Sequence, residues 1–387
     1  MNENITRVAL ICKNEFQAGG ASTYEANLIS YLVGQENSQI EFVIFEPSKM
    51  KRSLEYSAVV FYSFGPISQF FAFTRSLLPK SFCSNLWGIL QGNLARKLNE
   101  NSIDIAYFLS PNPVALGLFS IPVITTVWDL GHRENGGFRE LASFGNYRKR
   151  EHYYSRTLLR SKLVITDSDV TSSKLVEFYK VHPDSTLSGG LFPKITDVNN
   201  GAVKHFSSMP YPYIIYPAQF WPHKNHEFLL ELMHDLKQNF SDLKLVLTGS
   251  DKGNLEIVQR RIRALGLDND VKILGFVESE YLCHLISNAE LMVFPSLLGP
   301  TNLPPLESLI LGTPVVVTDK NSDLIHSPEN GIWVVSEDSK KDYIQAISSA
   351  LLGEHEIKRW SFESANKNKA QEIIFRLKAD TKLKSFL

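Results

Sequence analysis

Apolar and polar residues alternate in blocks along the first half of the chain. Short apolar runs that are each followed by an amphipathic stretch are typical of a parallel sheet wrapped by helices. The runs predicted to be strands are Val8–Lys13, Ile40–Phe45, Ala58–Tyr62, Ile103–Phe108, Val123–Val127 and Leu163–Thr166. The stretches predicted to be helices include Ser22–Leu32, Asn85–Leu98 and Ser172–Tyr179. From about Asp197 to Pro212 the pattern gives way to Asn, Gly, Ser and Pro, which predicts a linker.

A second series of the same kind follows the linker. Its predicted strands are Tyr213–Tyr216, Leu243–Leu247, Val271–Ile273, Leu291–Phe294 and Pro314–Val317. Its predicted helices are Glu227–Asn239, Leu255–Leu265, Ser279–Ser287 and Pro305–Leu311. We therefore expect an α/β protein of two doubly wound, Rossmann-like units, residues 1–196 and 205–366, with a tail helix at about 367–387 that packs back on the first unit. Two such units are expected to bind a ligand between them, at the carboxyl ends of their strands.

Composition excludes several classes of protein. Of the 387 residues, 43% are apolar and 21% are charged, as in ordinary globular proteins. The 40 basic residues are balanced by 41 acidic ones, which disfavours a nucleic-acid partner. Cys12, Cys83 and Cys283 are scattered without metal-site or disulfide spacing, which favours a reducing compartment. Because no signal-peptide core and no run of 18 apolar residues is found, we expect a cytoplasmic protein.

The strongest local pattern covers residues 295–318, which read as strand, loop, short helix, turn and strand. The loop that ends at Leu303 is expected to present backbone N–H groups at a helix N-terminus, where anions are favoured. Glu307 then lies on the first turns of that helix, where its carboxylate is suited to accept both hydroxyls of a ribose. On this fragment alone, a tight strand–helix connection with a solvated Glu is an equally good interpretation.

The same segment resembles the donor-sugar signature of retaining GT-B glycosyltransferases, the large family that includes glycogen synthases, sucrose synthases and bacterial polysaccharide mannosyl- and rhamnosyltransferases. The signature carries two Glu residues. The second, which holds the nucleotide ribose, corresponds to Glu307. The first, which usually touches the donor sugar, corresponds to Gly299. The resemblance therefore implies that Thr301 and Asn302 supply the polar contacts to the donor, next to Leu303.

A second segment, residues 213–226, resembles the strand and loop with which this family neutralises the donor diphosphate. The family's Lys corresponds to Lys224, a compact charge that suits contact with both phosphates. The family's Arg corresponds to Gln219, so one formal charge is missing and other cations or helix termini must compensate. The family places the nucleobase after a later strand, at Phe276 and Val277. For Phe276, an aromatic ring that closes a domain core is an equally good interpretation.

In the first unit, two loops carry the resemblance. Gly20 completes a pair of glycines between the first strand and a helix, and such pairs permit close backbone approach to a ligand. Residues 123–132 resemble the family's strand that ends in His-Asp-Leu, with Trp128 at the usual His position. Asp129 and His132 are therefore expected to orient the acceptor hydroxyl or the donor sugar. The alternative for His132 is a loop histidine that is exposed or satisfies a carbonyl.

Residues 167–169, Asp-Ser-Asp, match the DxD metal motif of the other large glycosyltransferase fold. They follow a predicted strand and precede a predicted helix, so N-capping by Asp or Ser explains them. The GT-B resemblance assigns the phosphate charge to Lys and to helix ends. We therefore expect no catalytic metal and no cofactor, the nucleotide diphosphate sugar being a substrate.

Residues 138–162 carry seven Lys and Arg against two Glu, interleaved with aromatic residues. A basic, aromatic face centred on Arg148, Lys149 and Arg150 suits docking on an anionic membrane that carries a lipid-linked acceptor. The alternative is a helix with one buried aromatic face and one solvated basic face.

The resemblance implies a retaining transferase that moves a hexose or deoxyhexose, mannose or rhamnose above all, from a nucleotide diphosphate sugar to a glycan or polyprenyl-linked acceptor. Its expected setting is bacterial surface polysaccharide synthesis at the inner face of the plasma membrane. Two alternatives stay open. One is a nucleotide-sugar 2-epimerase of the same architecture. The other is a non-catalytic glycan-binding homologue, which the residues at Gly299, Gln219 and Trp128 favour.

Overall fold

The structure is a computed structural model, and the chain divides into two compact units. Unit 1 comprises residues 1–192 and 364–387, and unit 2 comprises residues 193–363. The residues that the structure describes are 5–12, 20–35, 39–47, 59–62, 93–118, 121–134, 137–138, 144–193, 206–298, 302–319, 330–353 and 360–381.

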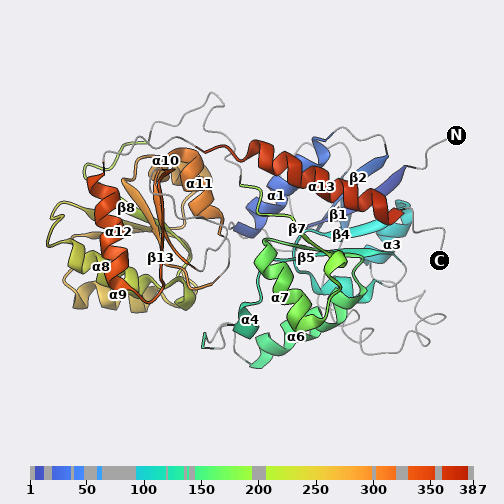
Figure 1. Cartoon of the computed structure of the whole chain (residues 1–387), viewed down its shortest axis with the longest axis horizontal. Helices are drawn as coiled ribbons and strands as arrows, with labels where there is room; N and C mark the ends of the chain where they lie inside the picture. Colours follow the sequence, from blue (N-terminus) through green and yellow to red (C-terminus); the bar gives the residue numbers. More distant parts are fainter. Residues whose placement is uncertain are drawn as a thin grey trace. The chain divides into compact units, whose positions relative to one another are not determined.

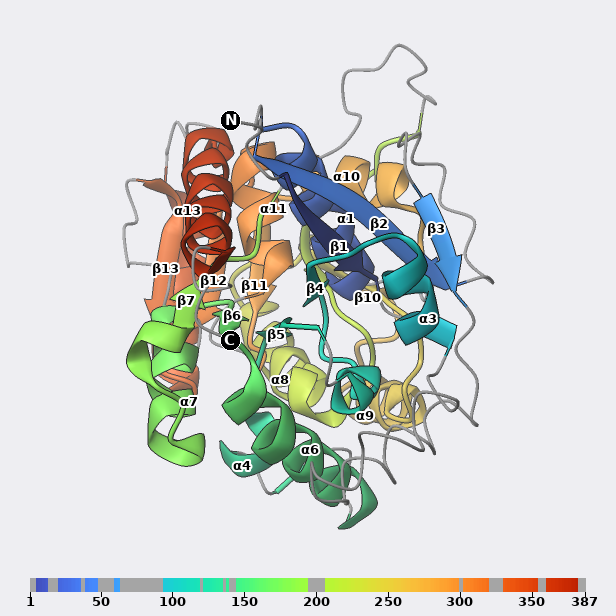
Figure 2. The same ribbon diagram turned by 90° about the vertical axis from the view of Figure 1, so that its right-hand side faces the viewer.

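Unit 1 is built on a parallel sheet in the order β3-β2-β1-β4-β5-β6-β7. Figure 2 shows β1, β2 and β3 side by side. The strands are β1 (Thr6–Ile11), β2 (Ile40–Pro47), β3 (Val59–Tyr62), β4 (Ile105–Phe108), β5 (Val123–Val127), β6 (Leu163–Thr166) and β7 (Thr186–Ser188). The helices are α1 (Gly20–Val33), α3 (Asn93–Glu100), α4 (Gly131–Glu134), α6 (Phe144–Thr157), α7 (Asp169–Tyr179) and α13 (Glu363–Thr381). Figure 1 shows α1 and α13 on one side of this sheet and α6 and α7 on the other.

The last helix, α13, belongs to unit 1 although it is far from the rest of that unit in sequence. Ala370, Ile373 and Leu377 recur at helical spacing and are completely buried. The Lys369 ammonium donates a hydrogen bond to the backbone carbonyl of Ser188 over 2.8 Å. Burial of one apolar stripe against the sheet therefore holds the C-terminal helix on the first unit.

Unit 2 repeats the doubly wound pattern, with the parallel strand order β10-β9-β8-β11-β12-β13. The strands are β8 (Tyr213–Pro217), β9 (Lys244–Thr248), β10 (Val271–Gly275), β11 (Leu291–Phe294), β12 (Val315–Thr318) and β13 (Ile332–Val335). The helices are α8 (His226–Leu236), α9 (Leu255–Ala264), α10 (Ser279–Ser287), α11 (Leu303–Leu311) and α12 (Lys340–Leu352). In Figure 1, α8, α9 and α12 cover one face of the sheet, and α10 and α11 cover the other.

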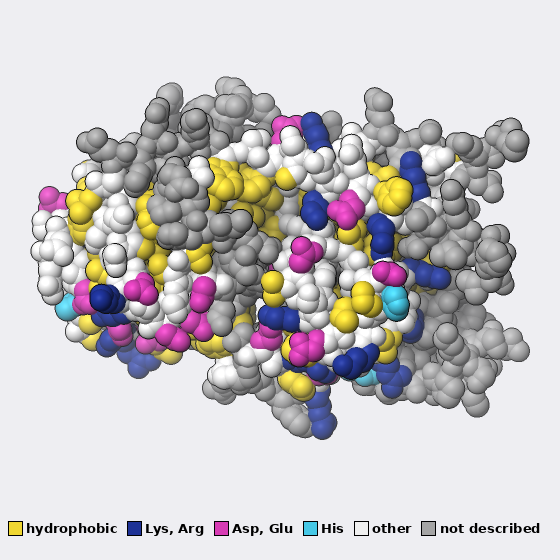
Figure 3. Space-filling model, in the orientation of Figure 1, with side chains coloured by type: hydrophobic (Ala, Val, Ile, Leu, Met, Phe, Trp, Pro, Cys, Tyr) yellow, Lys and Arg dark blue, Asp and Glu magenta, His cyan; other side chains and the backbone are white. Residues whose placement is uncertain are grey.

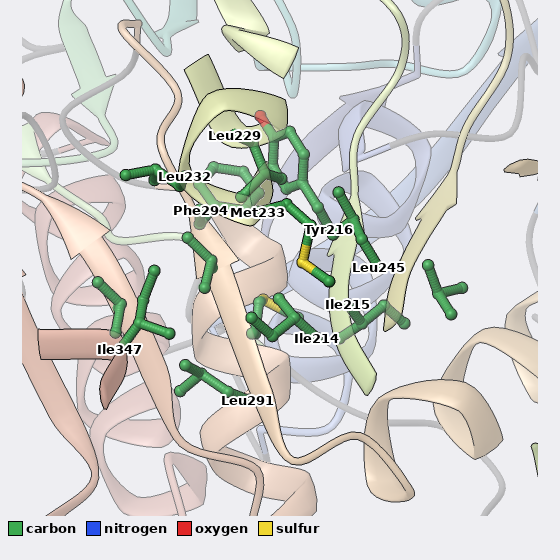
Figure 4. Close-up of a cluster of buried hydrophobic side chains, with 14 of the residues drawn as sticks. Ile214, Ile215, Tyr216, Leu229, Leu232, Met233, Leu245, Leu291, Phe294 and Ile347 are labelled. Carbon is green, nitrogen blue, oxygen red and sulfur yellow. The ribbon is translucent and has the colours of Figure 1, made fainter. Parts of the chain in front are cut away.

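The apolar residues of the strands explain why helices cover both faces of the sheet in unit 2. Strands β8 and β11 are buried along their whole length, as expected for central strands that are covered on both faces. Figure 4 shows Tyr216 and Phe294 from these strands against Leu229 and Met233 of α8. Helix α11 ends where Gly312 adopts φ +86°, a left-handed conformation that glycine takes without strain.

The fold class expected from the sequence, two Rossmann-like α/β units, is confirmed. The expected strands and helices are present, with ends displaced by a few residues. Two short strands, β7 and β13, were not predicted from the sequence. The predicted helix Asn85–Leu98 is described only from Asn93, and part of the predicted linker likewise lies outside the described residues. Among the described helices, none is long and apolar enough to cross a membrane.

Candidate functional site

The centre of the site in unit 2 is the point where the strand order reverses. Strands β8 and β11 are neighbours in the sheet, and the chain leaves them in opposite directions. Doubly wound folds bind ligands at the carboxyl ends of such a pair of strands. The connection from β8 to α8 carries Lys224, and the connection from β11 to α11 carries Ser296 and Asn302. The Lys224 ammonium donates to the Ser296 hydroxyl over 3.0 Å and to the Asn302 side-chain oxygen over 3.2 Å.

The backbone around Lys224 is held by two hydrogen bonds and by the conformation of the next residue. The Tyr216 hydroxyl donates to the Lys224 carbonyl over 2.7 Å. The Leu297 amide donates to the His223 carbonyl over 3.0 Å, which ties the two connections together. Asn225, the next residue, adopts φ +56°, a left-handed conformation that Asn tolerates better than most residues. The tertiary structure thus fixes where the ammonium of Lys224 lies.

Gln219 lies in the same connection, and its side chain accepts a hydrogen bond from a neighbouring residue. The Trp221 indole donates to the Gln219 side-chain oxygen over 3.0 Å. The Trp221 ring in turn stacks with the His223 imidazole, with centroids 6.2 Å apart and planes 19° apart. The expectation that Gln219 lies at the donor site stays a prediction.

Glu307 on α11 has an unusual environment for a carboxylate. Within the part of the chain that the structure describes, no hydrogen-bond donor or cation contacts its oxygens. Burial raises the pKa of Glu307 to about 7. A carboxylate that accepts no hydrogen bond from the described residues is well suited to hydrogen bonds from a ligand's hydroxyl groups.

The first turn of α11 has fewer backbone donors than an ordinary helix start. Leu303 is the first residue of the helix, and Pro304 and Pro305 follow it. Proline has no N–H group, so two donors are missing from the first turn. Leu303, at the first position of the helix, keeps its backbone N–H group.

Two further donor-site candidates follow β10. The Phe276 side chain is 56% exposed, so it does not close the core of unit 2. Val277 next to it is partly buried and packs on that core. An exposed aromatic ring at the carboxyl end of a strand suits stacking on a nucleobase. Gly299 and Thr301 lie outside the described residues.

In unit 1, Asp129 follows β5 and is engaged in a salt bridge. The Arg150 guanidinium lies 2.6 Å from the Asp129 carboxylate, and the Gly131 amide donates to the same oxygen over 2.8 Å. Burial by itself would raise the pKa of Asp129, but the charge of Arg150 and these hydrogen bonds outweigh it and lower the pKa. Asp129 is therefore a carboxylate that stays ionised at neutral pH.

His132 is buried rather than exposed in its loop. Its Nε2 lies 2.8 Å from a Glu151 oxygen and 3.0 Å from the Tyr179 hydroxyl. Burial, and then the charge of Arg150, lower the pKa of His132. The Glu151 carboxylate also accepts two hydrogen bonds from Arg133, which help to lower the pKa of this carboxyl to about 2. These contacts join α4, α6 and α7, and Glu151 was missed by sequence reasoning because nothing local marks it.

Gly20 opens α1, and the preceding loop lies outside the described residues. Trp128, at the end of β5, packs edge-on against Tyr24 of α1 with ring centroids 5.7 Å apart. Its ring is therefore part of the packing between the sheet and α1.

The Asp-Ser-Asp segment caps a helix. The Ser168 hydroxyl accepts a hydrogen bond from the Thr171 amide over 3.2 Å at the start of α7, which confirms the N-capping interpretation. Throughout the described residues, no group of three or more His, Cys, Asp or Glu side chains is arranged to hold a metal ion.

Helix α6 has an aromatic buried side and a basic exposed side. Tyr153 and Tyr154 are buried, whereas Arg148, Lys149 and Arg156 are exposed. The expectation that Arg150 belongs to the exposed cations is wrong, because this side chain is bound to Asp129. Lys, Arg, Asp and Glu side chains are intermixed on the face that Figure 3 shows.

Comparisons with known proteins point in one direction. Residues 200–369 match the model of the family described as "Glycosyl transferases group 1". The chain is 32% identical over 124 residues to the uncharacterized glycosyltransferase MJ1607 of Methanocaldococcus jannaschii, which covers 31% of each protein. It is 29% identical over 140 residues to the O-antigen chain mannosyltransferase RfbU of Salmonella typhimurium, which covers 35% of this chain and 38% of RfbU. The matched region thus spans about a third of the length of these curated relatives.

Solved structures share the architecture over nearly the whole chain. Sucrose-phosphate synthase of Thermosynechococcus elongatus superposes with a TM-score of 0.65 at 16% identity and covers 98% of both chains. Anabaena Alr3699/HepE, in complex with UDP and glucose, superposes with a TM-score of 0.64 at 15% identity and covers 99% of this chain and 100% of its own. The two α/β units therefore have the GT-B fold.

Proposed function

We propose that this chain is a glycosyltransferase that uses a nucleotide diphosphate sugar as donor. One observation carries the proposal: Lys224 and Asn302, which are far apart in sequence, meet at the switch point of unit 2. Glu307, whose carboxylate accepts no hydrogen bond from the described residues, lies on the helix that follows Asn302. The family match covers this region, and its relatives' names are those of transferases.

In the proposed reaction, the bond between the sugar's anomeric carbon and the diphosphate oxygen breaks, and a bond to the acceptor oxygen forms. The acceptor's proton moves to the leaving diphosphate, and the new bond forms on the face that the diphosphate leaves. The sugar passes through an oxocarbenium-like state. Lys224 stabilises the negative charge that grows on the diphosphate, a preorganised electrostatic effect. Glu307 holds the ribose.

A thermal-shift panel of nucleotide diphosphate sugars tests the donor site. We expect one donor to stabilise the protein, by about 2.7 kcal/mol at a concentration of 100 times its Kd. Glu307→Ala and Lys224→Ala should lose this shift, whereas the matched variant Glu256→Ala, on the exposed face of α9, should keep it. If no nucleotide diphosphate sugar shifts the wild-type transition, the donor site is wrong.

For the transferred sugar, we propose a hexose or deoxyhexose, and mannose or rhamnose above all. The sugar is moved with retention of configuration to a glycan or polyprenyl-linked acceptor. The similarity to a named mannosyltransferase supports mannose. Proton NMR of the product reports the configuration of the new linkage. The epimerase alternative is not favoured by the transferase relatives, and it predicts epimerised nucleotide sugar without any acceptor. The non-catalytic alternative predicts neither transfer nor donor hydrolysis.

We also propose that α6 contacts the cytoplasmic side of an anionic membrane, where the protein reaches a lipid-linked acceptor. The exposed cations Arg148, Lys149 and Arg156 support this, together with Leu159, which is 63% exposed just after the helix. Each basic residue near such a surface contributes about 1 kcal/mol. Catalysis is proposed to need no metal ion.

A further inference from the structure

The two connections that carry the proposed diphosphate site are short of positive charge. The two connections that meet there, residues 218–225 and 295–302, contain one formal charge, that of Lys224. A nucleoside diphosphate brings at least two negative charges, which one ammonium does not balance. His223 is the one other side chain in these two connections that gains a positive charge near neutral pH.

His223 is held in place by its neighbours. Its ring stacks on Trp221, and the Trp221 indole is anchored by Gln219 over 3.0 Å. Its carbonyl accepts the Leu297 amide from the opposite connection. The side chain is partly exposed, as a ligand contact requires. An aromatic face also favours a cation, so the stack with Trp221 supports the protonated imidazole.

The neighbouring His226 cannot take this role. Its ring is buried, stacks on Phe220 with centroids 4.6 Å apart, and lies against Tyr216. Burial, followed by the charge of Lys224, lowers the pKa of His226 to about 3, so it stays neutral at physiological pH. Of the two histidines at this site, only His223 has a partly exposed side chain.

We propose that His223 is the second cation of the diphosphate site, with Gln219 and Trp221 as the residues that position its ring. The inference rests on the proposed donor site. Lys224 and His226 lie close to His223 in sequence, and the opposite connection contributes the neutral Ser296 and Asn302. The β9–α9 connection, which pairs with Phe220, adds the charged residues Asp251 and Lys252. A bound diphosphate favours the imidazolium of His223. Binding therefore takes up a proton and is tighter at acid pH.

Inorganic pyrophosphate is the probe, because it has no ribose and does not involve Glu307. Calorimetric titration at about pH 6 and about pH 8.5 brackets the ordinary titration of histidine. We expect His223→Gln to weaken pyrophosphate binding about tenfold at the lower pH and about twofold or less at the higher pH. His223→Arg should bind tightly at both pH values. His234→Gln, an exposed histidine on α8, is the matched control and should change neither affinity. The probe's own ionisation is common to all variants.

Two variants test the positioning. Trp221→Phe keeps a ring for stacking but loses the hydrogen bond to Gln219, and Gln219→Leu removes the acceptor of that bond. Both should weaken binding at about pH 6 more than at about pH 8.5. If Gln219 contacts the phosphate directly, Gln219→Leu should instead weaken binding equally at both pH values, and Trp221→Phe should have no effect.

The outcomes separate this inference from the proposed function. If folded His223→Gln loses nothing, or loses equally at both pH values, the inference is overturned while the donor site stands. If wild-type protein binds neither pyrophosphate nor any of UDP, GDP, dTDP and ADP, the proposed function fails and the inference fails with it. Circular dichroism of each variant checks that the fold is kept.

Discussion

Replacement of Glu307 by Gln should make the unliganded protein more stable at neutral and alkaline pH. The pKa of this carboxyl is about 7 in the folded chain against an ordinary value of 4.5. Between these two pH values the folded chain binds more protons than the unfolded chain, so the free energy of unfolding of the wild type falls as the pH rises. Gln carries no charge at any pH and escapes this loss.

The magnitude follows from the two pKa values. One pH unit between them is worth about 1.36 kcal/mol, so the interval from 4.5 to about 7 sets an upper bound of about 3.4 kcal/mol. Glu307 is partly exposed, and water that reaches its oxygens lowers the expected gain to about 1–3 kcal/mol. The gain should be close to zero below pH 4.5 and complete above about pH 7.

Urea unfolding of the wild type and of Glu307→Gln, at several pH values across this window, measures the effect. Glu256→Gln, on the exposed face of α9, is the matched control and should show no such pH dependence. A stability difference that is the same at both ends of the window would refute a raised pKa. The same variant should bind free nucleoside diphosphate about tenfold to a hundredfold more weakly, because charge-assisted hydrogen bonds to ribose are worth about 1.5–3 kcal/mol.

Further predictions concern the turnover number, the backbone conformation of Asn225, the need for a metal ion and binding to membranes. Lys224→Ala should lower kcat more than it raises KM, because charge on the leaving group grows toward the transition state, and Lys224→Arg should restore only part of the rate; an unchanged kcat at saturating donor would remove Lys224 from the mechanism. Asn225→Ala should lower the free energy of unfolding in urea by about 1 kcal/mol, whereas Asn225→Gly should not, because φ is +56° there. Activity should survive treatment with EDTA. Loss of activity in EDTA that magnesium or manganese reverses would contradict the proposal. Joint replacement of Arg148, Lys149 and Arg156 by Ala should lower co-sedimentation with anionic vesicles by about two orders of magnitude at low salt and by less at high salt, with no change on neutral vesicles.

Local patterns were enough to predict most elements of the fold. The predicted strands at Val123–Val127, Leu163–Thr166 and Leu291–Phe294 coincide with β5, β6 and β11. Central strands of a parallel sheet are buried on both faces, so each must be a continuous apolar run that is visible in the sequence. The short edge strand Thr186–Ser188 has no such run, because an edge strand has fewer buried positions, and it was missed.

The site could be predicted in part. Lys224, Asn302 and Glu307 were expected near a donor, and the structure brings the first two together at one switch point. Sequence could not show that the oxygen of Gln219 holds Trp221, because the bond depends on the turn of the β8–α8 connection. The roles of these residues in binding and catalysis stay predictions.

The sequence by itself determined the two apolar–amphipathic series, the helix start at Ser168 and the charge balance, because each depends on residues that are close together in the chain. Only the tertiary structure decided the partners of ionisable side chains. Arg150 was expected to be an exposed cation and binds Asp129, and His132 was expected at a substrate and contacts Glu151. These pairs join segments that lie about 20 residues apart and meet only when α4 and α6 pack beside the end of β5. A charge that this packing partly removes from water needs a partner, and the partner is chosen by geometry that no local pattern contains.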